Sequence, residues 1–323
     1  MARNFVYDDT YEDPEEKTER QVRERRFFMY SPAALTVADQ IERIYINHHS
    51  FKSALASIDR IFQLGSRTTV PQGLMLIGEP GTGKSCVMKL FQAYAPRDAL
   101  FSPSASTILI RLQERPSVGR ILTHILRQLD YPFSNVPRHA VGLKRDIAIE
   151  AIKQKRHRLL MVDEAHHLVY ARHASKDWHE GNEVSEFLRE VMDECQLGLV
   201  LAATHTLDQL ADIDKHLCSR VSARIELKDF SKGPEWIAFL QAYVQQCKAF
   251  DLKGIENPKS ASMWLAASNG NLRVFKQLLV EGVLIAVDDG KRSIELPHLK
   301  TAFERVFGAD TRRKNPFIEK EEK

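Results

Sequence analysis

The chain has 323 residues, of which 43% are hydrophobic and 28% charged, proportions typical of a folded globular protein. At about 150 residues per domain, this length predicts roughly two domains, or one large α/β domain with an appendage, and it excludes a mini-protein. The formal net charge of +3 arises from 46 basic and 43 acidic residues and indicates no particular partner by itself.

The sequence predicts neither a membrane segment nor an export signal. No apolar run approaches the roughly 18 residues that a membrane span needs, and the first residues lack the apolar stretch of a signal peptide. The four cysteines are widely spaced and form no CxxC pair, so neither a disulfide framework nor a zinc site is expected. We therefore expect a cytoplasmic protein that makes no membrane contact.

The chain begins with a charged stretch. Residues 1–30 carry six basic and eight acidic side chains, which favours a flexible or partner-ordered arm. A helix is predicted from Ser31, because Ser31 and Pro32 supply an N-cap and a first-turn proline before apolar residues at mostly helical spacing up to Ile46. A second apolar stripe over residues 51–62 predicts another helix.

After residue 73, short apolar runs alternate with amphipathic stretches, a pattern typical of a parallel sheet covered by helices. Beyond about residue 231 only helical patterns remain prominent. We expect a charged arm over 1–30, an α/β domain with N-terminal helices over 31–230, a small helical domain over 231–307 and a charged partner-binding tail over 308–323. The five runs lie at residues 74–77, 108–110, 159–162, 199–202 and 223–227.

Residues 78–85 match the phosphate-binding pattern G-x-x-x-x-G-K-[ST], between a strand-like run and an amphipathic stretch. Glycines let backbone N–H groups surround phosphates, and Lys84 is expected to contact the β- and γ-phosphates of ATP. Ser85 is expected to offer its hydroxyl to Mg²⁺. The expected nucleotide-binding residues are Gly78, Glu79, Pro80, Gly81, Thr82, Gly83, Lys84, Ser85 and Cys86.

Two acidic residues follow the third apolar run. We expect Asp163 to hold Mg²⁺ through water and Glu164 to polarise the attacking water. Residues 163–166 also spell the Asp-Glu-Ala-His box of a helicase, but the chain after Leu227 lacks the second motor lobe with its Q-x-x-G-R-x-G-R motif. An ATPase is therefore expected, and His166 is interpreted as a solvated loop residue.

Together these motifs resemble those of AAA+ ATPases. The resemblance implies a P-loop core with a five-stranded parallel sheet, followed by a helical lid. It also implies roles for further residues: Thr204 as the sensor-1 residue, Arg220 as an arginine finger for a neighbouring subunit, and Arg273 as the sensor-2 residue. Arg224 remains an alternative to Arg220, because only four residues separate them.

Within AAA+ proteins, the chain is most similar to the TnsC/TniB transposition regulators over residues 31–317. The similarity rests on the N-terminal helical pair, the Gly-Asn-Leu-Arg segment at 270–273 and the Asn-Pro-Phe segment at 315–317. It implies an ATP-dependent homo-oligomer, a ring or filament on duplex DNA with little sequence preference. Such a regulator links a target-selection protein, for which a CRISPR-associated system is one candidate, to the transposase.

Residues 97–145 carry eight basic and three acidic side chains. Within this segment, Arg115 and Arg120 are the expected DNA phosphate contacts, and Phe317 is expected to anchor the tail on the transposase or its companion nuclease. Two alternatives stay open: a replication initiator or loader, and a secretion or signalling ATPase without DNA binding. The sequence leaves open the target-selection partner, the oligomer number and whether hydrolysis drives assembly or disassembly.

Overall fold

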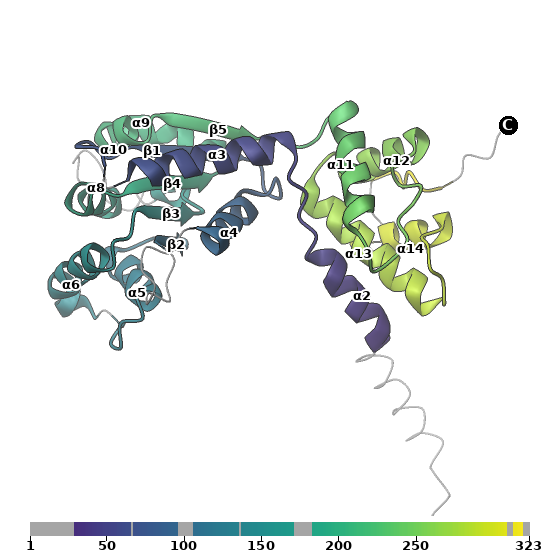
Figure 1. Ribbon diagram of the computed structural model, residues 1–323, viewed down its shortest axis with the longest axis horizontal. Coiled ribbons are helices and arrows are strands. Elements are labelled where there is room, and N and C mark those ends of the chain that lie inside the picture. Colours follow the sequence, from purple (N-terminus) through teal and green to yellow (C-terminus); the bar gives the residue numbers. More distant parts are fainter. Residues whose placement is uncertain are drawn as a thin grey trace, which may run out of the picture. The chain divides into compact units, whose positions relative to one another are not determined.

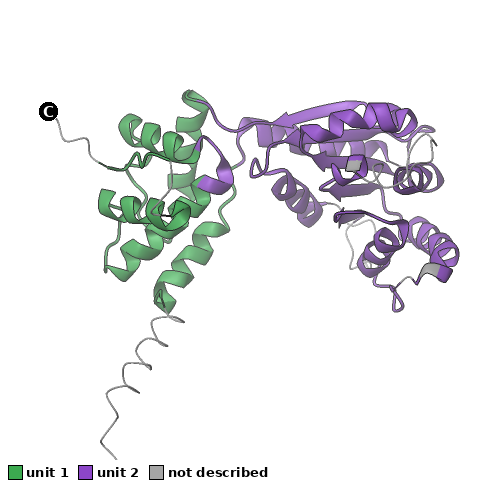
Figure 2. Cartoon of the chain, turned by 180° about the vertical axis from the view of Figure 1, so that it is seen from behind, with its two compact units in different colours: residues 1–46, 232–268, 275–323 green, residues 47–231, 269–274 purple. Residues whose placement is uncertain are grey.

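The computed structural model describes residues 29–65, 67–95, 106–135, 137–170, 183–308 and 313–318. The chain divides into two compact units (Figure 2). Unit 1 comprises residues 1–46, 232–268 and 275–323, and unit 2 comprises residues 47–231 and 269–274. Most of the predicted N-terminal arm, residues 1–28, lies outside the described residues.

Unit 2 contains a five-stranded sheet with the order β2-β3-β4-β1-β5 (Figure 1). All neighbouring strands pair in parallel, as the alternation of apolar runs and helical patterns predicted. Each predicted run forms one strand, so the expected α/β fold is confirmed. The strands are β1 (Gly73–Gly78), β2 (Thr107–Arg111), β3 (Leu159–Asp163), β4 (Gly198–Ala203) and β5 (Ala223–Leu227).

Both faces of the sheet are covered. Alternate residues of β1 show this: Leu74 and Leu76 pack with α3 (His49–Leu64) and α4 (Lys84–Tyr94), while Met75 and Ile77 belong to the core on the opposite face. Burial of the strands on two sides explains why their sequences read as nearly continuous apolar runs. The helices of the opposite face include α5 (Val118–Gln128), α6 (Val141–Gln154), α7 (His167–Tyr170), α8 (Glu183–Cys195), α9 (Leu210–Ile213) and α10 (Lys215–Arg220).

Unit 1 is helical, as predicted for the region after residue 231. Its core is aromatic: the ring of Phe275 lies 5.2–5.5 Å from the rings of four other aromatic side chains. These are Trp236, Phe239, Tyr243 and Trp264. The helices of unit 1 are α2 (Pro32–Glu42), α11 (Pro234–Gln246), α12 (Pro258–Ser268), α13 (Leu272–Asp288, whose first three residues belong to unit 2) and α14 (Leu296–Phe307).

The first helix differs from its prediction in two ways. Ser31 caps it and Pro32 opens it, as expected, but α2 ends at Glu42 and does not reach Ile46. It also belongs to unit 1 instead of the α/β domain. The Tyr243 hydroxyl of α11 donates a hydrogen bond of 2.9 Å to the Ile41 carbonyl, and α2 packs its alanines against α13.

The position of Phe317 corrects the prediction for the tail. Its side chain is only 2% exposed, and its ring packs against Trp264 and Phe303 of unit 1. The Asn315 side chain donates to the Lys300 carbonyl and accepts from the Phe317 amide, which fixes the turn at Pro316. Phe317 therefore fills a pocket of its own chain and is not available to anchor a partner. Within the described ranges, no helix is both long and apolar enough to cross a membrane.

Candidate functional site

A turn with two glycines of positive φ connects β1 to α4. Gly81 has φ of 93° and Gly83 has φ of 100°, values that a residue with a Cβ adopts only with strain. Between them Thr82 is buried, and its hydroxyl donates a hydrogen bond of 2.9 Å to the Glu79 carbonyl. The glycines thus allow the backbone to curl in front of the α4 N-terminus, where free N–H groups favour an anion.

The Lys84 ammonium lies inside this turn. Its Nζ atom donates hydrogen bonds of 2.7 Å to the Gly78 carbonyl and 2.9 Å to the Glu79 carbonyl. Burial lowers the pKa of Lys84, and the carboxylates of Glu164 and Asp163 act in the opposite direction. The cation is thus held at the mouth of the turn by carbonyl groups that phosphate oxygens could replace.

The Ser85 hydroxyl meets the end of β3. Its Oγ atom donates a hydrogen bond of 2.7 Å to Asp163 Oδ2, across 78 residues of sequence. Asp163 is 9% exposed, and its other oxygen accepts from the Glu164 amide at 3.0 Å. The structure therefore brings together the two residues that the sequence assigned to Mg²⁺.

Glu164 lies one residue beyond β3 with φ of 56°, a left-handed backbone conformation that is uncommon for residues other than glycine. Its Oε1 atom accepts a hydrogen bond of 3.2 Å from Arg111, the last residue of the neighbouring strand β2. Its Oε2 atom lies 3.3 Å from His166 Nδ1. The pKa of His166 is lowered, mainly by burial, and the lower pKa favours the neutral ring.

Neither partner of Glu164 was recognised in the sequence. His166 is not a solvated loop residue: its side chain is 17% exposed and faces the Glu164 carboxylate. Arg111 was counted only as one of several basic residues. Its position at the end of the second apolar run indicates only that it lies at the carboxyl edge of the sheet; the adjacency of β2 to β3, on which the contact depends, is visible only in the structure.

Thr204 follows β4 directly, and β4 lies between β1 and β3 in the sheet. This order places Thr204 at the same edge as the P-loop and the Asp163–Glu164 pair. Its hydroxyl donates a hydrogen bond of 3.2 Å to the Thr206 hydroxyl. The position fits the expected sensor, and its role stays a prediction.

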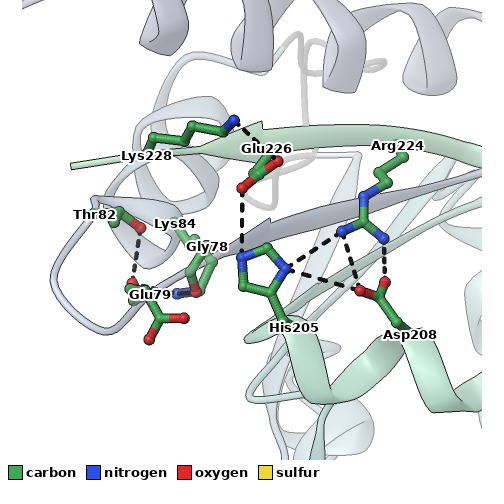
Figure 3. Close-up of polar contacts among 9 residues, drawn as sticks. All are labelled: Gly78, Glu79, Thr82, Lys84, His205, Asp208, Arg224, Glu226 and Lys228. Atoms are coloured by element: carbon green, nitrogen blue, oxygen red, sulfur yellow. Dashed lines mark hydrogen bonds and ion pairs between the residues drawn. The ribbon is translucent and has the colours of Figure 1, made fainter. Parts of the chain in front are cut away.

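The two candidate arginine fingers both form ion pairs within their own chain. Arg220, the last residue of α10, pairs with Asp193 of α8. Arg224 on β5 pairs with both oxygens of Asp208, which lowers the pKa of that carboxyl, and lies 3.4 Å from the His205 ring (Figure 3). Arg224 is thus held at more points than Arg220.

The predicted sensor-2 segment contacts the P-loop backbone. The Asn271 side chain donates hydrogen bonds of 2.9 Å to the Pro80 carbonyl and to Asp229. Two residues later, the Arg273 amide donates to the Gly81 carbonyl at 3.3 Å. The Arg273 charge also contributes to lowering the pKa of Lys84, so this segment lies within electrostatic reach of the phosphate turn.

Arg115 and Arg120 lie apart from these residues, at the N-terminus of α5. With Ser117, Thr123 and other residues they line a cavity of about 690 Å³. The Ser117 side chain caps α5 by accepting from the Arg120 amide. Neither arginine forms an ion pair with another described residue, so both can meet an external anion.

The family described as bacterial TniB protein matches residues 37–232. The comparison with curated proteins finds no match.

Several solved structures share the fold. The ORC2 protein of Aeropyrum pernix, solved as ADPNP–ADP complexes, has a TM-score of 0.59 and 14% identity over 83% of this chain and 70% of that one. The ORC1 protein of the same organism, in complex with DNA, has a TM-score of 0.58 and 15% identity over 81% of this chain and 66% of that one. Domain III of the Thermotoga maritima replication initiation protein DnaA has a TM-score of 0.55 and 12% identity over 85% of this chain and 98% of that one.

At these identities the solved structures show the fold alone, the α/β P-loop fold of AAA+ ATPases. This chain spans about two thirds of the ORC1 chain that it matches. The family match is more informative, because it covers more than half of the chain and includes the whole candidate site except the Asn271–Arg273 segment. The chain belongs to the TniB family and has the α/β P-loop fold of AAA+ ATPases.

Proposed function

We propose that this protein hydrolyses ATP with Mg²⁺ and that its ATP-bound form assembles as a homo-oligomer on duplex DNA, where it links a target-selection protein to a transposase. The observation that carries the catalytic part is the 2.7 Å contact between Ser85 and Asp163, with Glu164 next in sequence. P-loop, metal-binding and water-activating groups then meet at one sheet edge. The transposition role rests on membership of the TniB family.

The residues present fit Mg²⁺. The Ser85 hydroxyl and the Asp163 carboxylate are hard oxygen donors, and Mg²⁺ commonly takes few protein ligands beside phosphate oxygens and water. Within the described residues, no cluster of three or more His, Cys, Asp or Glu side chains could hold a metal alone. When bound, Mg²⁺ would neutralise charge on the β- and γ-phosphates.

The remaining roles follow from position. Lys84 would exchange its two carbonyl contacts for phosphate oxygens. Glu164 would orient the attacking water and accept its proton, which requires that its carboxylate leave Arg111 or His166. Arg273 on the first turn of α13 would face the bound nucleotide, as the sensor-2 assignment implies.

A composite active site is part of this proposal. We assign the finger to Arg220, because an arginine that reaches into a neighbouring subunit has to give up its ion pair within its own chain. The Arg220 contact is a single ion pair to Asp193, whereas Arg224 is bound by both oxygens of Asp208. Arg220 would leave its carboxylate for the γ-phosphate of the next subunit.

The catalytic proposal is tested by Glu164→Gln, with Glu235→Gln on α11 as the matched control. The first change keeps the shape of the site and removes the base. We expect ATP hydrolysis to fall by at least about 10²-fold while ATP binding persists. Hydrolysis at the control rate would refute the assignment of Glu164.

The DNA-binding proposal rests on Arg115 and Arg120, which line the α5 cavity together with Glu183 and form no ion pair with another described residue. Changing Arg115 and Arg120 to alanine should weaken binding to unrelated duplexes by similar factors. It should reduce the slope of log K against log salt by about 1.8 per subunit if each contacts one phosphate. The control removes two exposed charges of the same unit elsewhere, Arg67 and Lys89. An unchanged slope in the Arg115/Arg120 variant would place the DNA surface elsewhere.

A replication initiator or loader is the second candidate, because the similar solved structures include ORC and DnaA proteins. Capture of purified transposase by the ATP-bound protein on DNA would favour transposition. Capture of a replicative helicase would favour the alternative. If ATP does not stimulate salt-dependent duplex binding at all, the third class, an interaction ATPase of secretion or signalling, gains support.

A further inference from the structure

Unit 1 contains a groove that the nucleotide and DNA proposals do not use. It has a volume of about 720 Å³ and lies among α2, the C-terminal end of α11, the segment after it, and the C-terminal end of α13. Half-buried valines line its floor, one from each of the three helices: Val37, Val244 and Val287. The buried side chains of Phe250 and Leu252 extend this apolar surface.

The rim of the groove is basic. Four of its lining side chains are cationic and exposed, and one, Asp251, is acidic. The Asp251 carboxylate already accepts a hydrogen bond of 3.0 Å from the backbone amide at position 253. Of the cations, one is paired with Glu295, and the others form no ion pair within the described ranges. The four are Lys248, Lys253, Lys291 and Arg292.

An apolar floor inside a basic rim fits a peptide that combines apolar or aromatic side chains with carboxylates. Such a segment exists in this chain. Residues 5–16, Phe-Val-Tyr-Asp-Asp-Thr-Tyr-Glu-Asp-Pro-Glu-Glu, contain six acidic side chains, three aromatic ones and no basic one. The carboxylates of the segment therefore complement the basic rim of the groove, and its aromatic side chains complement the apolar floor.

The arm also enters unit 1 beside the groove. The Ser31 amide, just before α2, donates a hydrogen bond of 3.2 Å to Asp288, the last residue of α13. Asp288 is adjacent in sequence to Val287 of the groove floor. The twelve residues 17–28 between the acidic segment and Met29 can span up to about 40 Å when extended. The tether is therefore long enough to bring the segment to the groove of the same chain.

We propose that the acidic segment, residues 5–16, docks in the groove of unit 1 of its own chain, with aromatic side chains on the valine floor and carboxylates at the basic rim. The tether raises the effective concentration of the segment to about the millimolar range, so even modest affinity fills the groove. The docked arm excludes other acidic peptides from this surface. This inference does not depend on ATP hydrolysis or DNA binding.

The test places a photo-crosslinking residue, p-benzoylphenylalanine, at Tyr7 of the full-length protein. After irradiation, we expect crosslinked peptides from residues 244–253 or 287–292. Reversing three rim charges should lower the yield by about tenfold, since each exposed ion pair contributes little but three are reversed together. The rim variant carries Lys248→Glu, Lys253→Glu and Arg292→Glu. The control variant makes the same charge change on exposed lysines of unit 1 outside the groove, Lys232→Glu, Lys259→Glu and Lys300→Glu.

A charge swap distinguishes loss of the ion pairs from misfolding of the rim variant. Changing Asp8, Asp9, Glu12 and Asp13 to lysine should abolish the crosslink on the normal groove and restore it on the reversed groove. Mixing ¹⁵N-labelled with unlabelled protein identifies the occupant, because docking within one chain yields crosslinked pairs of uniform label. Mixed-label pairs would assign the groove to the arm of a second copy and overturn the proposal. Crosslinks outside the groove, or equal yields in rim and control variants, would also overturn it.

Discussion

Replacing Phe317 with alanine should destabilise unit 1 by about 3 kcal/mol. A buried phenylalanine removes about 150–250 Å² from water, an upper bound of roughly 4–6 kcal/mol at 25 cal/mol per Å². Measured Phe→Ala changes in cores cost about 3–5 kcal/mol. We take the lower end, because the short tail segment can detach and regain conformational freedom instead of leaving a rigid cavity. The expected fall in melting temperature is roughly 6–12 °C.

Tryptophan fluorescence can follow unit 1 selectively. Two of the three tryptophans, Trp236 and Trp264, lie in its core, and Trp178→Phe removes the third. Urea unfolding in this background should show the Phe317→Ala midpoint well below that of Ile318→Ala, a neighbouring side chain that is 53% exposed. The control should stay within about 0.5 kcal/mol of the parent. Equal midpoints for the two variants would refute the buried position of Phe317.

Two further predictions concern unit 2. Arg220→Ala should keep ATP binding and lose turnover by roughly 10³-fold or more, and mixing it with Lys84→Ala protein should restore part of the activity. ATPase activity per subunit that is independent of protein concentration would contradict an active site shared between subunits. Burial and the Lys155 charge lower the pKa of His157 to about 4 from 6.5, so the unfolded chain binds the extra proton between these values. Stability should therefore fall by roughly 2 kcal/mol from pH 7 to pH 5. Urea unfolding should show a weaker pH dependence in His157→Leu but not in a variant of the exposed His49, and identical slopes would exclude His157 as the cause.

Much of the fold could be predicted because it depends on local patterns. Strands buried on both faces leave continuous apolar runs, which mark β1 to β4, whereas the edge strand β5 alternates apolar and charged residues. The P-loop has fixed glycine positions that the sequence shows directly. The proximity of Ser85 and Asp163 was also predictable. Both residues belong to motifs whose strands lie near each other in any sheet of this type.

Other contacts could not be predicted, because the residues that they join are far apart in the sequence and no sequence motif links them. The bond between Arg111 and Glu164 depends on the adjacency of β2 and β3 and on the unusual φ of Glu164. Burial of Phe317 depends on a space left between Trp264 and Phe303, which are far apart in sequence. A single aromatic residue in a charged tail looks solvated until the packing of the helices is known.

The charged residues on β5 have a consequence for how copies of this chain can associate. β5 is an edge strand of the sheet, and Arg224, Glu226 and the adjacent Lys228 lie along it, joined by ion pairs to one another or to the helical turn after β4. An edge strand offers unpaired backbone groups to any passing strand, and charged side chains along it discourage such pairing. Growth by adding strands from copy to copy, the route to β-aggregation, is therefore opposed at this edge. An ordered assembly that uses this side of the sheet would have to form through side-chain surfaces instead.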